Sequence, residues 1–254
     1  MDFPLASAVA SRFEVVAESL STNAALRAFS ADEDAWPHLS VLATDNQTAG
    51  RGRLDRSWDA PAGASLAISV LLRNLPAQIE ARGWIPLAAG AAMANAVAAQ
   101  LTGRDVGVKW PNDVLVDGHK ICGILAESTG DAIVLGAGIN TRMTAAQLPV
   151  PTATSFEVLG VDVDTDRLAA DYLRRLDEML AALIAAGDAE ASGLHGEVTA
   201  RCVSIGRLVD VALPDGSALH GQATRLENDG RLVVESAGRE NLIAAGDVVH
   251  ARLA

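Results

Sequence analysis

Short apolar runs recur along the first part of the chain and predict β-strands. The runs at 39–47 and 65–72 predict two buried strands, the first leading into an arginine-rich loop. Residues 106–128 predict a strand, a Pro-Asn-Asp turn, a second strand, an Asp117-Gly118 hairpin and a third strand. The run at 132–140 predicts a further strand that ends in a glycine-rich turn. These strands alternate with helical stretches.

Four stretches carry helical patterns. We expect a first helix near 5–18 and a second one in 21–30, for which Ser21 or Thr22 is the candidate N-cap. The stretch 84–101 is rich in Ala and Gly and contains a proline and polar side chains, so it predicts a buried core helix and not a membrane span. Helical spacing from 166 to about 187 predicts a long amphipathic helix that closes the first domain.

The pattern of predicted secondary structure changes beyond residue 198. Short β-rich runs there are separated by Pro-Asp-Gly and Asn-Asp-Gly, which favours a small antiparallel barrel of about 55 residues. The sequence therefore predicts two domains, 1–198 with the functional site and 199–254 as a small accessory barrel.

Composition and charge narrow the function. Of the 254 residues, 50% are hydrophobic and 20% are charged, which is typical of a globular protein. A net charge of -12 opposes a broad nucleic-acid surface. Two cysteines and the lack of a signal-peptide pattern favour a reducing compartment. We therefore expect a cytoplasmic protein without nucleic-acid or membrane partners.

The stretch GRGRLDRSW at 50–58 concentrates positive charge in this acidic chain. Arg51, Arg53 and Arg56 alternate with glycines, so the backbone can approach a ligand while the guanidinium groups reach phosphate or carboxylate oxygens. Trp58 could cover a purine or a bicyclic ligand, or could belong to the core. A solvated basic turn and a single RNA-binding Gly-Arg copy are the alternatives for this loop.

A lysine after the Asp117-Gly118 turn is the second candidate anchor. Strand alternation places Lys120 on the face shared with Cys122 and Ile124, where it would face a ligand or extend to the surface. Asp113 could bind Mg²⁺ or cap its turn. The stretch at 135–140, LGAGIN, lacks the full dinucleotide fingerprint and therefore does not favour a Rossmann domain.

Together these motifs resemble the biotin protein ligase family over nearly the whole chain. They are STN at 21–23, GRGRLDRSW at 50–58, KWPNDVLVDGHKICGIL at 109–125 and GAGIN at 136–140. The resemblance implies an α+β fold: a mixed, largely antiparallel sheet with helices, followed by a small C-terminal all-β barrel like a Src-homology-3 domain. It also implies a two-step reaction in which biotin and ATP give biotinyl-5′-AMP, and a lysine of a biotin carboxyl carrier protein then accepts biotin.

The resemblance implies a role for each matching residue. Lys120 and Arg53 would be catalytic, Lys120 lying between the biotin carboxylate and the α-phosphate. The residues implied for biotin are Ser21, Thr22, Asn23, Gln47, Gly50, Arg51, Gly52, Arg53, Lys120 and Gly123. Those implied for ATP and the adenylate are Arg51, Arg53, Arg56, Trp58, Lys120 and Asn140. Asp113 would bind Mg²⁺ or orient the acceptor amine, and the arginine loop would order over the adenylate to exclude water.

Three features set this chain apart within the resemblance. Asp55 stands where family loops usually have glycine, which could weaken loop closure, and Cys122 stands where a small residue is common. Only about 20 residues precede the STN motif, too few for a winged helix-turn-helix. We therefore expect a ligase without repressor activity, acting as a monomer or a weak homodimer.

Two other functions compete with this interpretation. A lipoate ligase or octanoyltransferase would share the fold and a lysine on the equivalent strand. A non-catalytic binding module would retain biotin or nucleotide without releasing AMP or pyrophosphate. The tandem arginine loop with its tryptophan favours biotin over lipoate, and the presence of both Lys120 and Arg53 opposes a module without catalysis.

Overall fold

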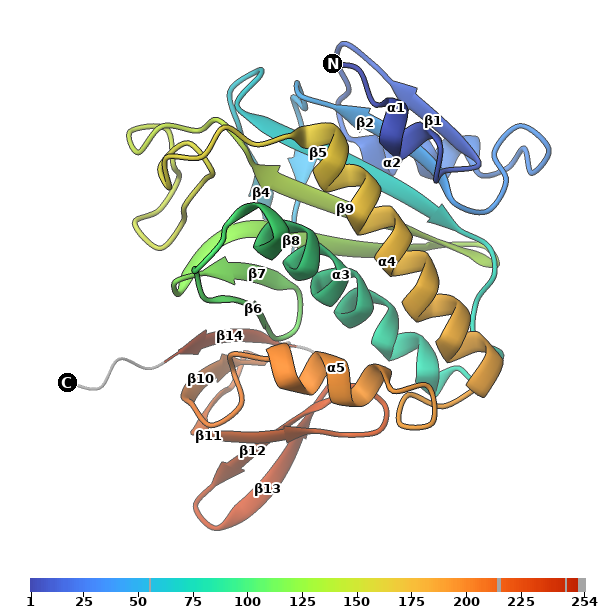
Figure 1. The fold of residues 1–254 in the computed structure, drawn as a ribbon. Helices are drawn as coiled ribbons and strands as arrows, with labels where there is room; N and C mark the ends of the chain where they lie inside the picture. The colour runs from blue at the N-terminus through green and yellow to red at the C-terminus, as the bar shows by residue number, and fades with distance from the viewer. Residues whose placement is uncertain (55, 214–215, 245, 251–254) are drawn as a thin grey trace.

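The computed structural model describes residues 1–54, 56–213, 216–244 and 246–250, and within these ranges a seven-stranded mixed sheet forms the centre of the molecule (Figure 1). Only β1 and β2 pair in parallel; the other described neighbours are antiparallel. In spatial order the strands are β1 (Arg12–Val15), β2 (Ser40–Thr44), β5 (Ser65–Leu72), β9 (Ala132–Asn140), β8 (His119–Thr129), β7 (Asp113–Val116) and β6 (Val106–Lys109).

Two long helices, α3 (Ile85–Gln100) and α4 (Thr165–Ala186), lie side by side over one face of this sheet (Figure 1). Alternate side chains of β5, among them Leu66 and Ile68, point into this layer and form the main core. The helix α4 starts at an Asp164 cap and stops at Gly187, whose φ of 68° suits a glycine. Shorter helices, α1 (Pro4–Ser7), the 3₁₀ helix Glu80–Trp84 and α5 (Leu194–Arg201), complete the layer.

The opposite face of the sheet carries α2 (Thr22–Phe29) and the site. Leu26 of α2 packs with Leu42 and Val134 in a second, smaller apolar cluster. A short hairpin, β3 (Gly50–Arg51) and β4 (Ser57–Trp58), lies over the same face and carries the arginine loop. The helices α3 and α4 therefore support the sheet from below while α2 and the hairpin line the site above.

The C-terminal part forms a five-stranded antiparallel sheet in the described residues, in the order β13-β12-β11-β10-β14. Its strands are β10 (Leu208–Ala212), β11 (Ala218–Leu226), β12 (Leu232–Ser236), β13 (Arg239–Ile243) and β14 (Asp247–His250). Indole groups of the first part hold this sheet: Trp84 Nε1 donates to Asn228 O at 2.7 Å and Trp110 Nε1 to Gly230 O at 3.0 Å. The all-β C-terminal region is confirmed, and the strand β14 reaches the site.

The predicted helix near 5–18 is wrong. Only α1 forms, and residues 12–15 instead make β1, the edge strand that pairs with β2. Phe13 packs on Phe3 with ring centroids 5.0 Å apart, and the Arg12 guanidinium lies 4.1 Å from the Trp36 ring. Tertiary contacts on both sides of this segment outweigh a weak local helical preference.

The other predicted helices and strands are present. The stretch predicted as a buried helix is α3, and both Asp117 and Gly118 have positive φ, as their two-residue hairpin requires. No helix in the described ranges combines the length and apolar character needed to cross a membrane. The predicted boundary between residues 198 and 199 falls inside α5, so the division into two domains stays a prediction.

Candidate functional site

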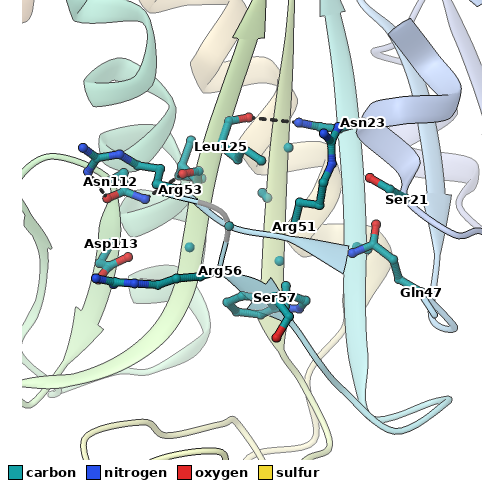
Figure 2. Close-up of a pocket in the computed structure, with 18 of the residues that line it drawn as sticks. Ser21, Asn23, Gln47, Arg51, Arg53, Arg56, Ser57, Asn112, Asp113 and Leu125 are labelled. Atoms are coloured by element: carbon teal, nitrogen blue, oxygen red, sulfur yellow. Dashed lines mark hydrogen bonds between the residues drawn. The ribbon is translucent and has the colours of Figure 1, made fainter. Parts of the chain in front are cut away.

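A cavity of about 120 Å³ opens on the face of the sheet that carries α2, beneath the arginine loop (Figure 2). We define the arginine loop as residues 50–58, of which 50–54 and 56–58 are described. The predicted site residues that line the cavity are Ser21, Thr22, Asn23, Gln47, Arg51, Gly52, Arg53, Arg56, Trp58, Asp113, Lys120 and Gly123. The fold thus brings side chains from four separate segments of the sequence into one site.

Glycines of β8 and β9 form the floor of this cavity. A Cβ atom at Gly138 would lie 2.5 Å from Cε2 of Trp58, and one at Gly136 would overlap Oδ1 of Asn23. Nonbonded atoms do not tolerate such approaches, so any larger residue would displace these side chains. The predicted glycine-rich turn is therefore wrong, because the glycines lie within β9 and leave room for Asn23 and Trp58 against the sheet.

The N-terminus of α2 forms an uncharged polar wall. Ser21 caps the helix, and Thr22 donates through its backbone N and its Oγ1 to Gln47 Oε1, at 2.9 and 3.1 Å. Ser69 Oγ donates to Asn23 Oδ1 at 2.6 Å. Because each of these groups is fixed by another, the wall presents donors and acceptors in set directions, which suits a neutral polar ligand group.

Two arginines of the loop reach opposite sides of the cavity (Figure 2). The Arg51 guanidinium extends toward α2 and donates to both oxygens of Glu127, at 2.9 and 3.2 Å. Arg53 instead donates to Asn112 Oδ1 at 3.0 Å and to Gly246 O at 3.1 Å. Burial lowers the pKa of Arg53 from its ordinary value, although nearby carboxylates oppose the shift.

The C-terminal sheet contributes a carboxylate to the site. Asp247, the first residue of β14, lines the cavity and pairs with Arg56. The hydrogen bond from Arg56 holds the pKa of Asp247 below its usual value, against the opposing effect of burial. The loop is therefore held at one end by the first part of the chain and at the other by the C-terminal sheet.

Lys120 lies on the β8 side of the cavity, where its Nζ is 2.6 Å from Asp113 Oδ1. A second ammonium, that of Lys109, is 3.9 Å from Asp113 Oδ2, and burial lowers the pKa of Lys109. The two lysines share one carboxylate, so this side of the cavity is electropositive. Such a surface attracts carboxylate or phosphate oxygens.

The predicted orientation of Lys120 is wrong in one respect. It does not share a face with Cys122 and Ile124, because a β-bulge shifts the register of β7 against β8 and places Leu115 opposite Lys120. The bulge turns Lys120 to the side of Gly123, where a Cβ atom in place of the glycine hydrogen would lie 3.1 Å from the lysine Nζ. Cys122 stays fully buried on the helix side, where desolvation raises the pKa of its thiol.

The Trp58 indole packs against the glycines that form the floor of the cavity. Its ring atoms lie where side chains at positions 123 and 138 would begin, so the glycines Gly123 and Gly138 leave room for it. Lys120 Nζ lies 5.7 Å from the centroid of the ring. The indole Nε1 is buried and has no hydrogen-bond partner among the described residues. A buried donor without a partner is costly, so a ligand acceptor at this point would offset that cost.

Some predicted residues do not line the cavity. Gly50 is buried under Gln47 and Trp58, and a Cβ atom there would overlap atoms of both residues. Asn140 donates its Nδ2 to Thr154 O at 2.9 Å and lies outside the cavity wall. Asp55, predicted to affect loop closure, lies outside the described residues.

The prediction from sequence missed the three side chains that pair with the arginines of the loop: Asn112, Glu127 and Asp247. Asn112 precedes Asp113 in a motif that was recognised, so its position was a usable signal. Glu127 follows Leu125 by two residues on β8 and could have been found by strand alternation. Asp247 has no local signal, since only the packing of the C-terminal sheet brings it to the loop.

Carboxylates near the cavity are dispersed. No group of three or more His, Cys, Asp or Glu side chains in the described part of the chain could hold a metal ion unaided. Asp113 and Asp247 both line the cavity.

Comparisons of the sequence with known proteins find similarity to one family of ligases. The sequence profile described as "Biotin/lipoate A/B protein ligase family" matches residues 17–143. The biotin–[acetyl-CoA-carboxylase] ligase of Mycobacterium tuberculosis is 40% identical over 244 residues, covering 95% of this chain and 90% of that protein. The bifunctional ligase/repressor of Escherichia coli is 39% identical over 137 residues, which cover 51% of this chain and 42% of that protein.

The fold also resembles solved structures. The biotin protein ligase from Aquifex aeolicus in complex with biotin and ATP superposes with a TM-score of 0.78 at 25% identity, covering 96% of this chain and 100% of that one. The similarity therefore extends over nearly the whole length of both chains, including the C-terminal sheet.

Proposed function

Because the chain belongs to the biotin/lipoate A/B protein ligase family, we propose that it is an ATP-dependent ligase that activates biotin and transfers it to a lysine of a carboxylase carrier protein. One observation carries this proposal. A cavity with an uncharged polar wall at one end and Lys120 and Arg53 at the other matches a ligand with a neutral ring system and an anionic end. Biotin has this shape, with a ureido ring and a carboxylate joined by an aliphatic chain.

In the first step, an oxygen of the biotin carboxylate attacks the α-phosphorus of ATP, and the bond to pyrophosphate breaks. Both reactants are anions, so the site must offset their repulsion and align them. Lys120 would lie between the two reacting groups, and Arg53 would hold the phosphate of the adenylate. The wall of Ser21, Thr22 and Asn23 would fix the ureido ring, which aims the carboxylate at the nucleotide.

In the second step, the ε-amine of the carrier lysine attacks the carbonyl carbon of biotinyl-5′-AMP, and AMP leaves. Asp113 would orient this amine or hold Mg²⁺ with the nucleotide phosphates; the metal would supply further positive charge when bound. Trp58 would cover the adenine with the face of its indole ring. The cavity of about 120 Å³ is small for these ligands, since sites for small molecules usually measure roughly 300–1,000 Å³. The arginine loop would therefore open to admit them.

The test is transfer of biotin to a purified biotin-carboxyl-carrier domain by the pure protein with ATP and Mg²⁺, scored by mass on the acceptor lysine. One added biotin mass that depends on ATP supports the proposal. Lipoate or octanoate attached to its own carrier, with no biotin transfer, would assign the chain to the lipoate branch of the family. Binding of biotin with no release of pyrophosphate would indicate a module that retains the ligand without catalysis.

A further inference from the structure

Glu127 lies beside the cavity and contacts both of the elements that would enclose a ligand. Its side chain, 17% exposed, projects from β8 between α2 and the arginine loop. Asn23 Nδ2 donates to its Oε2 at 2.9 Å, while Arg51 donates to both of its oxygens. Arg27 of α2 donates to Oε1 at 3.0 Å from the outer side. Glu127 does not line the cavity itself.

The carboxylate fixes the orientation of the Asn23 amide. A carboxylate accepts hydrogen bonds and does not donate them, so only the NH₂ end of the amide can face Glu127. Asn23 Nδ2 also donates to Leu125 O at 3.2 Å, and its Oδ1 faces Ser69. Glu127 thus acts together with Leu125 and Ser69 to fix which end of the amide faces each neighbour.

The same carboxylate fixes Arg51 and thereby one end of the loop. Hydrogen bonds between charged groups are about twice as strong as neutral ones, and Arg51 donates two of them to Glu127. Two guanidinium groups meet one carboxylate here, so Glu127 also keeps two like charges together at the rim of the cavity. A lysine would repel the two guanidinium groups, and a neutral amide would not offset their charge, so only a carboxylate can hold them together here.

We propose that Glu127 is a positioning residue that couples the polar wall to the arginine loop. The proposal rests on the function given above, because it concerns how the biotin ring and the adenylate are held. A ligand ring seated against Asn23 keeps the amide directed at Glu127, and the carboxylate in turn holds Arg51 in the closed loop. Closure of the loop and binding of the ring therefore stabilise each other through one carboxylate.

Steady-state kinetics of the Glu127→Gln variant test this coupling. The variant keeps the volume of the side chain and removes its charge. We expect KM for biotin to rise roughly 10- to 150-fold, the range that follows from loss of a hydrogen bond to a charged group, while kcat changes little. We also expect more pyrophosphate release per biotin transferred, because a loosened loop would lose the adenylate to water.

The matched control is Arg27→Met. It removes the outer guanidinium from the same carboxylate but leaves Asn23 and Arg51 in contact with it. Arg27 makes a single hydrogen bond to the carboxylate and does not belong to the arginine loop, so we expect its removal to change KM for biotin by less than about fivefold. If Arg27→Met raises KM as much as Glu127→Gln does, Glu127 merely anchors α2 and the coupling is refuted.

A double-mutant cycle that combines Glu127→Gln with Arg51→Met tests whether Glu127 acts on biotin binding through Arg51. If Glu127 acts through Arg51, the two substitutions together should cost much less than the sum of their separate effects. Additive effects, or an unchanged KM in Glu127→Gln, would overturn the inference. Should Glu127→Gln fail to fold, Glu127→Asp, which keeps the charge but shortens the reach, takes its place. An unmodified protein that transfers no biotin would instead refute the function, so the two failures are distinguishable.

Discussion

Replacing Gly138 with alanine tests whether the absence of a side chain at this position of β9 fixes Trp58, and with it the proposed nucleotide end of the site. The new Cβ would lie 2.5 Å from Cε2 and 2.8 Å from Nε1 of Trp58, so the indole must move by about an ångström to restore normal contact. Gly138 has no positive φ, and alanine fits its backbone conformation. The expected effect is therefore displacement of Trp58 and of the loop residues attached to it.

The cost follows from the size of the clash. Insertion of one methyl group into a packed site costs about 1–3 kcal/mol, which corresponds to roughly 5- to 150-fold if all of it opposes binding. Because Trp58 belongs to the short hairpin β3–β4 and not to the main core, most of this cost should appear in ligand binding and little in global stability. We expect a higher KM for ATP and a nearly unchanged thermal midpoint.

Gly136→Ala is the matched comparison on the same strand. Its Cβ would overlap Oδ1 of Asn23, so it should raise KM for biotin more than KM for ATP. Initial rates of pyrophosphate release, measured with each substrate varied in turn, separate the two effects. The assignment of the two ends of the cavity is refuted if both variants change the same KM, or if Gly138→Ala leaves both substrates unaffected.

Two further substitutions probe the charged side of the site, and a third probes the pH dependence of folding stability. Lys120→Ala should lower kcat by about 10²–10³-fold with the fold intact, since it removes a positive charge from the developing phosphate charge; near-normal turnover contradicts its role. Arg53→Ala should release pyrophosphate in excess of transferred biotin, and a loss of biotin affinity alone would contradict its assignment to the adenylate. Burial lowers the pKa of His250, so its contribution to folding stability is full above about pH 6.5 and falls as pH drops from there toward the lowered value. His250→Gln should keep a partner for Ser204 and flatten the pH dependence of the unfolding midpoint below about pH 6.5. A variant whose midpoint keeps the same pH dependence would show that His250 is not its source.

Local sequence signals predicted most elements of the fold because the relevant interactions are local. The cap and stop of α4, the Asp117-Gly118 hairpin and the apolar run of β5 each depend on a few neighbouring residues. Residues 12–15 were misassigned because their partners, β2 and Trp36, are distant in sequence. The glycines of β9 were assigned to a turn, although they lie within the strand and leave room for Asn23 and Trp58. Both of these side chains come from distant parts of the sequence, so no local pattern reveals this reason for glycine.

Prediction of the site was limited in the same way. Motif residues such as Lys120 were found, but the bulge that turns this side chain into the cavity depends on the register of β7 against β8. The partners that hold the loop are the least predictable part, since Asp247 begins the strand β14 of the C-terminal sheet and Gly246 directly precedes it. Sequence motifs therefore identify the groups that act on a ligand better than the groups that position them.

The pairing of charges explains how an acidic chain can hold an anionic intermediate, and it singles out one residue. Glu127 neutralises Arg51, and Asp247 neutralises Arg56. Arg53 forms no ion pair with a carboxylate in the described ranges; its partners are the neutral oxygens of Asn112 and Gly246. It is also half-buried, and burial lowers its pKa. A partly desolvated guanidinium that makes no direct ion pair gains most from an incoming phosphate, so Arg53, more than its two neighbours, should bind the adenylate.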